Sequence, residues 1–238
     1  MRTRPAHATL VAALVLSAPL ALPASGAATG GGASPDLPPG YARAVGPGGV
    51  TLLAPSTALL RQRVRLTGQA PARRAGAPVV IEQRDPSRGW LPAATARVRA
   101  NGSFATRWRS SRLGRVAIRA RIAASGARGA GDAPAVRVTV YRLGIASWFA
   151  PQRGMRDERT ACGVRFRAGT LGVANRSLPC GTRVAISYRG TTIVVPVIDR
   201  GPYVAGRDWD LTIAAARAIG LDSAGVGRIG ALVLRGTS

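Results

Sequence analysis

The first half of the chain alternates apolar and polar residues in short runs that are separated by turn residues. In Val64–Thr67 and Val116–Ile122 an apolar side chain recurs at every second position. This period of two is that of a β-strand with one buried face. The spacing of the runs predicts a β-sandwich over residues 49–142. We expect seven strands: Val50–Ala54, Arg63–Gly68, Pro78–Gln83, Trp90–Arg97, Ser103–Arg109, Gly114–Ile122 and Ala135–Tyr141.

Within this half, Asn101-Gly102 predicts a hairpin turn, and Trp90 and Trp108 are the expected core aromatics. Glu82 and Asp85 flank another turn and are expected to be solvated. The stretches G-W-x-x-x-A, N-G-S-F and R-A-R-I resemble those of bacterial immunoglobulin-like domains. A spacer is the expected role of this sandwich, and adhesion to a wall or a partner is the alternative.

The pattern changes at Gly144. Two apolar strands, Arg183–Tyr188 and Thr191–Ile198, are predicted to meet in a hairpin at Arg189-Gly190. Thr212 is expected to cap a short helix over Ile213–Ile219, with Gly220 ending it and Val226–Leu234 forming a last strand.

Between the hairpin and the helix, the apolar run of the second strand stops at Asp199, and Gly201-Pro202 then enforces a turn. A carboxylate at a strand end beside a rigid turn is well placed to meet a ligand. The alternative is that Asp199 caps the turn and pairs with Arg200.

Composition and the N-terminal residues indicate how the chain is divided. Hydrophobic residues make up 46% and charged residues 18% of the 238 residues, a globular balance that suits two domains. Arg2 and Arg4 precede an apolar stretch, Ala8–Leu22, which is too short to span a bilayer. We therefore expect a signal peptide over residues 1–28, a flexible leader over 29–48, no transmembrane anchor, and a protein that is secreted or associated with the cell wall.

The charge points to anionic partners. The net charge is +24, and all 34 basic residues are Arg. Outside the cell, anionic wall polymers and phospholipid head groups are the expected polyanions. Nucleic acid is not expected, because no nucleic-acid-binding motif is found. His7 is the only histidine and would leave with the signal peptide, so His-dependent catalysis, a metal site and a cofactor are not expected. Cys162 and Cys180 predict one disulfide in an exported protein.

Five motifs between Gly144 and Leu234 carry a resemblance: A-S-W-F, T-A-x-G, L-P-x-G-T-R-V, V-x-V-I-D-R-G-P-Y and D-L-T-x-A-A-A. In this order they resemble the rare lipoprotein A (RlpA) family, which is more distantly related to expansins and to a membrane-bound lytic transglycosylase. The resemblance implies a mainly β fold for residues 143–238. Its form would be a six-stranded double-psi β-barrel with a short helix and a glycan-binding groove that acts on peptidoglycan.

The resemblance makes Asp199 the expected catalytic residue. A lytic transglycosylase needs only one carboxyl, which serves first as acid and then as base. Asp210 matches the Asp of the family's D-L-S/T motif and is expected mainly to order the turn before the helix.

Three positions depart from the family's pattern. Active members carry Glu, Asp and His where this chain has Val164, Arg167 and Asn175. Asn175 can give polar support but cannot accept a proton at neutral pH. Asp157 and Glu158 are candidate replacement acids, although solvation is the simpler expectation for both.

Aromatic residues decide whether the groove binds sugar rings. Trp148, Phe149, Tyr203 and Trp209 are the candidates, with barrel core as the alternative, and we expect Trp148 in the core and Tyr203 at the groove edge. The expected substrate contacts are Trp148, Thr160, Arg200, Tyr203 and Asp210.

Three functions follow from these residues. The first is a secreted protein that binds peptidoglycan and cleaves it by lytic transglycosylation through Asp199. The second is a non-catalytic, expansin-like glycan binder that uses the same groove. The third is a structural adaptor that Arg residues hold to anionic wall polymers, but this function leaves the retained D-R-G-P motif unexplained.

Overall fold

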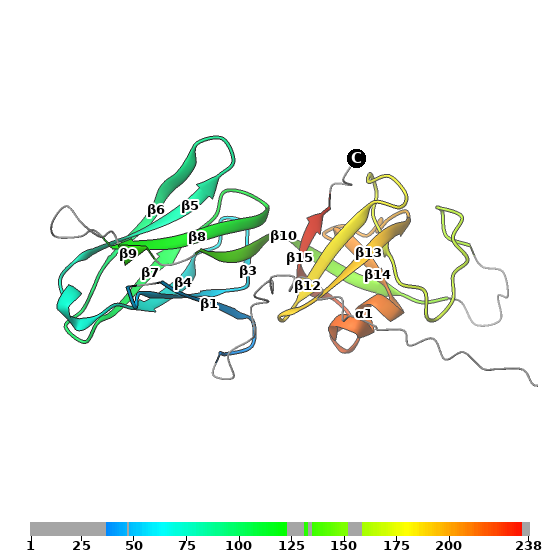
Figure 1. Ribbon diagram of the computed structural model, residues 1–238. Helices are drawn as coiled ribbons and strands as arrows, with labels where there is room; N and C mark the ends of the chain where they lie inside the picture. Colours follow the sequence, from blue (N-terminus) through cyan, green and yellow to red (C-terminus); the bar gives the residue numbers. More distant parts are fainter. Residues whose placement is uncertain (1–36, 47, 123–130, 133–134, 152–158, 235–238) are drawn as a thin grey trace, which may run out of the picture. The chain divides into compact units, whose positions relative to one another are not determined.

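The alternating residues of the first half form two sheets in the computed structural model, which describes residues 37–46, 48–122, 131–132, 135–151 and 159–234 (Figure 1). The first sheet is antiparallel and has the order β1-β2-β4-β7. Its strands are β1 (Tyr41–Val45), β2 (Thr51–Pro55), β4 (Val64–Gln69) and β7 (Ser103–Trp108).

The second sheet has the order β10-β8-β5-β6, with β3 paired to β10 and β9 to β8. Its strands are β3 (Thr57–Leu59), β5 (Pro78–Asp85), β6 (Gly89–Arg97), β8 (Gly114–Ile122), β9 (Gly131–Asp132) and the first half of β10 (Val136–Phe149). A 3-10 turn, η1 (Ala72–Arg74), lies between β4 and β5.

One hydrophobic core joins the two sheets. It contains Leu66 and Phe104 from the first sheet and Ile81 and Ile118 from the second. Every one of the seven expected strands is present to within a residue or two, except that the last continues as β10 to Phe149. The sandwich architecture is thus observed, while its immunoglobulin-like character stays a prediction.

Three expectations for this half are wrong. Residues 41–45 of the expected leader form strand β1. Trp90 lies outside the core, where the guanidinium of Arg119 sits 4.5 Å from its ring centroid. Glu82 is 5% exposed rather than solvated, because Arg119 and Arg121 bind its two carboxylate oxygens at 2.8 and 2.9 Å.

Strand β10 belongs to both halves of the chain. Residues 136–141 pair with β8 and β3, and residues 142–149 pair with β15 (Gly227–Val233) and β14 (Trp209–Thr212). The partners change between Tyr141 and Arg142, one residue from the expected domain boundary. The domain limits themselves remain a prediction.

Six strands of the second half close into a barrel in the order β10-β15-β12-β13-β11-β14, with β14 pairing back to β10. The remaining strands are β11 (Val173–Ala174), β12 (Arg183–Tyr188) and β13 (Thr191–Asp199). Alternate residues such as Val184, Ile186, Val195 and Val197 fill the interior. The expectation of a mainly β fold with a six-stranded barrel and one short helix is confirmed.

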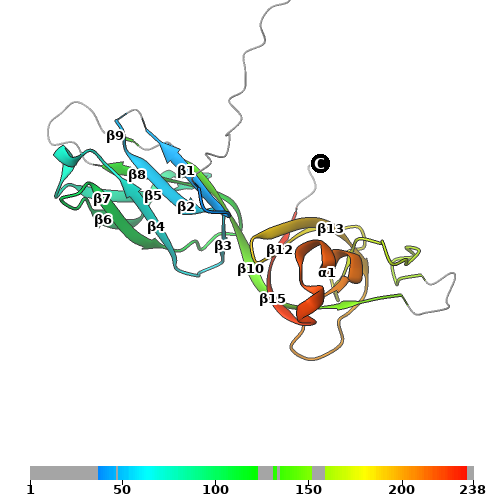
Figure 2. The same cartoon turned by 90° about the horizontal axis from the view of Figure 1, so that it is seen from below.

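The hairpin and the helix form where the sequence predicts them. Arg189 and Gly190 have φ of 47° and 90°, the left-handed pair that a two-residue hairpin turn requires. Helix α1 (Ile213–Ile219) begins after Thr212, whose hydroxyl accepts the N–H of Ala215. It contacts β10, β13 and β14, lies across one end of the ring of strands (Figure 2), and is followed by η2 (Asp222–Ala224). Within the described residues, no helix has the length and apolar character needed to cross a bilayer.

Candidate functional site

The candidate site is built around Asp199, the last residue of β13. Its Oδ1 accepts hydrogen bonds from the backbone N–H groups of Ala161 and Arg200, both at 2.8 Å. Its Oδ2 accepts no hydrogen bond from any residue that the structure describes. The half-buried carboxylate therefore has one oxygen that the backbone holds and one without a hydrogen-bond donor among the described residues.

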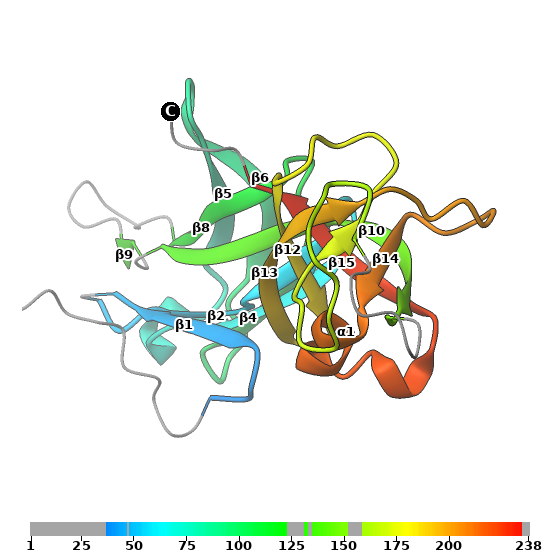
Figure 3. The same ribbon diagram turned by 90° about the vertical axis from the view of Figure 1, so that its right-hand side faces the viewer.

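A disulfide fixes the loop that supplies one of these donors. Cys162 and Cys180 are bonded, with their Cα atoms 5.7 Å apart, as the sequence predicts. The backbone N–H of Cys162 also donates to the carbonyl of Ile198 at 3.2 Å. Residues 159–182 thus lie against the end of β13, and Figure 3 shows them in lime and yellow next to the barrel strands.

The side chain of Arg200 also binds this segment, through hydrogen bonds to residues 175–180. Its Nη1 donates to the carbonyl oxygens of Leu178 at 2.8 Å and Asn175 at 3.2 Å, and its Nη2 donates to Cys180 Sγ at 3.2 Å. The guanidinium makes no ion pair with Asp199 in the described part of the chain, so the alternative in which these two side chains pair is wrong. The carboxylate does accept the backbone N–H of Arg200 in the turn. Contact between Arg200 and substrate stays a prediction.

Asn175 is already engaged within its loop. Its Oδ1 accepts the backbone N–H groups of Leu178 at 3.0 Å and Ser177 at 3.2 Å, and its backbone N–H donates to the carbonyl of Asp199 at 3.1 Å. Asn175 therefore lies beside Asp199 but uses its side-chain oxygen to shape the turn. Support for a reacting group, the role expected from the resemblance, stays a prediction.

The other positions that depart from the family pattern carry no acid. Val164 and Arg167 are exposed. Asp157 and Glu158, the candidate replacement acids, lie outside the described residues. Among the residues that are described, no acidic side chain joins Asp199 through a hydrogen bond.

Asp210 lies on β14, two strands from Asp199, and has its own partner. Ala174 of β11 pairs with Asp199 on one side and with Asp210 on the other, so two strand spacings, about 10 Å, separate the backbones of the two acids. The hydroxyl of Ser147 donates to Asp210 Oδ1, and Arg207 Nη1 donates to Ser147 Oγ at 3.0 Å. Asp210 thus ties β14 to β10. The expected ordering of the turn and contact of Asp210 with substrate stay predictions.

The aromatic candidates divide between core and surface. Trp148 packs against the barrel core and donates its Nε1–H to the carbonyl of Asp222 at 3.1 Å. Trp209 is buried, and Phe149 contacts Phe166 in a tilted arrangement with ring centroids 4.9 Å apart. Tyr203, by contrast, is 81% exposed, four residues after Asp199. The position of Trp148 agrees with the expectation that it lies in the core. Contact between the exposed Tyr203 ring and a sugar stays a prediction.

Thr160 is buried, and its Oγ1 accepts the N–H of Val164 at 3.3 Å, so a role in substrate contact stays a prediction. Sequence reasoning missed the N–H of Ala161 and the pair Ser147 and Arg207. A backbone donor has no side-chain signature. Ser147 meets Asp210 only through the pairing of β10 with β14, and Arg207 reaches this pair through Ser147. No group of three His, Cys, Asp or Glu residues suited to a metal ion occurs among the described residues.

Comparison with known proteins places this site in a family domain. A family model described as "Lytic transglycolase" matches residues 142–231. The "Probable endolytic peptidoglycan transglycosylase RlpA" of Synechocystis sp. is 49% identical over 95 residues, which cover 38% of this chain and 29% of that protein. The protein of the same description from Aquifex aeolicus is 40% identical over 97 residues, covering 40% of this chain and 42% of that protein.

Among solved structures, the Streptomyces papain inhibitor (SPI) matches with a TM-score of 0.31 and 25% identity, covering 38% of this chain and 92% of that chain. The chain spans less than half the length of the two RlpA relatives given above. The range that the family model matches contains the strands of the closed barrel and Asp199. Residues 142–231 are therefore an RlpA-like double-psi β-barrel domain.

Proposed function

We propose that the barrel binds peptidoglycan glycan strands and cleaves them as a lytic transglycosylase, with Asp199 as the acid and the base. The observation that carries this proposal is the asymmetry of the Asp199 carboxylate. Two backbone donors hold Oδ1, while Oδ2 has no partner among the described residues. The relatives named as peptidoglycan transglycosylases support the same substrate.

The proposed reaction needs no second carboxyl. Protonated at Oδ2, Asp199 gives its proton to the glycosidic oxygen as the bond from that oxygen to the anomeric carbon breaks. The carboxylate then takes the proton of the sugar's own 6-hydroxyl, whose oxygen bonds to the anomeric carbon. The product is a 1,6-anhydro sugar, no water is consumed, and the carboxyl returns to its starting state.

Neighbouring residues would position the substrate and the acid. The exposed ring of Tyr203 would stack on a sugar. Arg200 and the Cys162–Cys180 disulfide would keep the N–H of Ala161 directed at Oδ1, and so leave Oδ2 toward the glycan. Because proximity and orientation contribute much of an enzyme's rate, we assign these groups a positioning role.

Mass spectrometry of peptidoglycan digests tests the proposal. Wild type should release 1,6-anhydro muropeptides, and Asp199→Asn should abolish the release while leaving thermal stability nearly unchanged, because an amide oxygen still accepts both N–H bonds. Asp222→Asn is the matched control, since it removes one carboxylate of the same domain outside the site. Equal release by wild type and Asp199→Asn would show that Asp199 is not the acid.

A non-catalytic, expansin-like glycan binder is the second candidate. It is favoured by Val164 and Arg167 at positions where active relatives would carry acids, and by the engagement of the Asn175 side chain in its loop. This function predicts wild type that sediments with peptidoglycan and releases no anhydro product. Tyr203→Ala should then weaken sedimentation about tenfold, if the ring contributes the stacking expected of one aromatic residue.

Both candidate functions require export of the protein to the cell wall. Residues 1–28, the expected signal peptide, lie outside the described residues, so their role remains part of the proposal. Sequencing the N-terminus of the protein recovered from culture medium or wall fractions tests it. A mature N-terminus near residue 29 is expected, and an intact Met1 in those fractions would contradict cleavage.

A further inference from the structure

Arginines cover the outer face of the first sandwich sheet. In β1, β4 and β7 the residues that face away from the core include Arg43, Arg65 and Arg107, all of which are exposed. Arg63 precedes β4 and Arg99 precedes β7, and both are also exposed. We call these five residues the arginine face: Arg43, Arg63, Arg65, Arg99 and Arg107.

Two of these charges oppose each other directly. Arg65 and Arg107 are Cα partners in the antiparallel pairing of β4 with β7. Like charges at directly opposite positions of a sheet destabilise it. The side chains of Arg43, Arg63, Arg65 and Arg107 make no ion pair or hydrogen bond with any described residue, and Arg99 donates only to Ser103 Oγ at 3.2 Å. The repulsion is therefore not offset within the described part of the sheet.

The surface beneath these arginines is hollowed. Two adjoining cavities of about 420 and 490 Å³ share Arg65, Arg99 and Ala105 in their linings. Neither lining contains an Asp or a Glu. A concave surface with charges of one sign concentrates counter-ions more strongly than a flat surface does.

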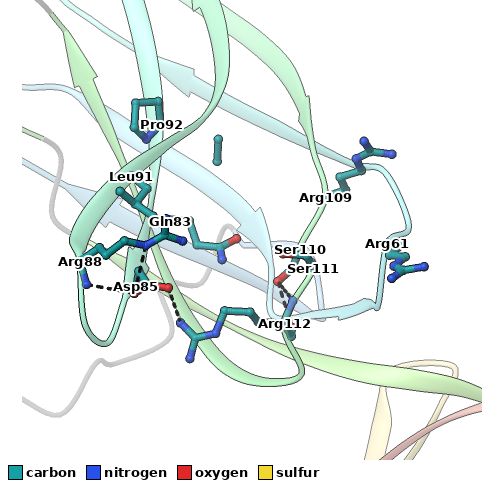
Figure 4. A pocket seen from close by; sticks show the side chains of 11 residues that line it. Arg61, Gln83, Asp85, Arg88, Leu91, Pro92, Arg109, Ser110, Ser111 and Arg112 are labelled. Carbon is teal, nitrogen blue, oxygen red and sulfur yellow. Dashed lines mark hydrogen bonds and ion pairs between the residues drawn. The ribbon is translucent and has the colours of Figure 1, made fainter.

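Four arginines elsewhere on the sandwich have acidic partners. Arg119 and Arg121 bind Glu82 on the second sheet. A cavity of about 760 Å³ is lined by four arginines, and Figure 4 shows Arg88 and Arg112 directed at Asp85, at 4.0 and 3.7 Å. The arginine face differs from both places, because its cations lack a carboxylate in the described structure.

We propose that the arginine face binds an extended polymer of phosphate groups. The planar guanidinium donates two parallel hydrogen bonds to a phosphate, and several guanidiniums within one hollow can bind successive phosphates of one chain. Such a ligand supplies the missing negative charge between Arg65 and Arg107. This assignment gives the sandwich a binding role in place of the spacer role expected from the sequence.

The face suits a polymer without bases. Proteins that bind single-stranded nucleic acid combine basic grooves with exposed aromatic rings on which bases stack. Phe104 is the only aromatic residue in the two linings, and it is 1% exposed. Tyr41, two residues before Arg43 in β1, is 42% exposed but lines neither hollow. The ligand should therefore be recognised through its phosphates alone.

Binding of fluorescently labelled linear polyphosphate to the full chain tests the proposal by anisotropy, at about 0.15 M salt. Arg65→Gln with Arg107→Gln should raise Kd about tenfold or more, since two charged contacts are lost. Arg115→Gln with Arg137→Gln is the matched control, because it removes two exposed charges from the second sheet. The control should bind as wild type does. Equal weakening of both double variants, or of neither, would overturn the proposal.

Two further measurements keep the test decisive. The Arg65 and Arg107 variant should unfold at the same temperature as wild type or higher, because a repulsion is removed; Arg63→Gln, outside the strands, repeats the test if that variant fails to fold. Single-stranded DNA of equal charge should bind more weakly than polyphosphate, and tighter binding of DNA would also overturn the proposal. Because no peptidoglycan is present, the result is independent of barrel activity.

Discussion

At the scale of single residues, the charge of Glu82 depends on its two arginine partners. Burial disfavours its ionised form, but hydrogen bonds and charge from Arg121 and Arg119 outweigh burial and lower the pKa of Glu82 below its ordinary value of 4.5. A carboxyl whose pKa is lower in the folded protein stabilises the fold above its unfolded pKa. This stabilisation is lost as the pH falls through the lowered value.

We therefore predict that Glu82→Gln lowers the free energy of unfolding by about 2 kcal/mol at neutral pH, because both charged hydrogen bonds are weakened. Below pH 4.5 the difference from wild type should shrink as wild type protonates. Hydrogen bonds from the N–H of Arg88 and from Ser87 lower the pKa of Asp85 to about 2. As the pH falls toward that value, wild type and Glu82→Gln should therefore lose the same further amount of stability. Urea denaturation across this pH range measures the effect, and a difference that does not vary with pH would contradict it.

Individual residues also show what the sequence can reveal about the site. The position of Asp199 at a strand end was predictable, because the sequence itself shows an acid at the end of an apolar run. The hydrogen bonds of the Arg200 side chain were not predictable from the sequence. Its three acceptors are backbone or sulfur atoms of residues 175–180, which are distant in the sequence. Thr160 and Trp148 belong to family motifs, and a motif does not separate residues that build the barrel from those that touch substrate.

At the scale of elements, Thr212 connects helix α1 to the barrel. Its buried Oγ1 accepts the N–H of Ala215 in α1 and the N–H of Gly172 before β11, both at 3.2 Å. Thr212→Val keeps the shape of the side chain but leaves both donors without this acceptor. We predict a loss of about 2 kcal/mol in the free energy of unfolding, measured by urea denaturation. Thr212→Ser, which keeps the hydroxyl, should retain most of the stability, and equal loss in both variants would contradict the assignment.

Element prediction succeeded where local chemistry decides the structure. The hairpin at Arg189-Gly190 and the helix between Thr212 and Gly220 have turn and cap residues that act over a few positions. Strands β11 and β14 were missed, because two and four residues are too short to show a period. They form because long-range partners are present: β11 lies between β13 and β14, and β14 closes the ring onto β10.

At the scale of the whole molecule, the order of two β-rich halves was predictable, but the way in which they are joined was not. The change of pattern at Gly144 suggested an end to the sandwich. Strand β10 instead continues through it, because its residues keep an extended conformation while their neighbours change from β8 to β15. The pattern of apolar residues predicts which side chains each half buries. The shared strand depends on which strands pair, and the pattern does not reveal this.

The net charge of +24 leads to a prediction for the molecule as a whole. Mutual repulsion of positive charges disfavours the compact state, and raising the ionic strength from about 0.01 to about 0.1 M shortens the screening length from about 30 to about 10 Å. The urea midpoint should therefore rise with added NaCl. Choline chloride should give the same rise, because screening by monovalent salts depends on ionic strength. The ion pairs of Glu82 oppose this trend only weakly, since buried pairs are screened less. A midpoint that falls with both salts would show that attractive ion pairs, and not repulsion among arginines, dominate the electrostatics of the folded chain.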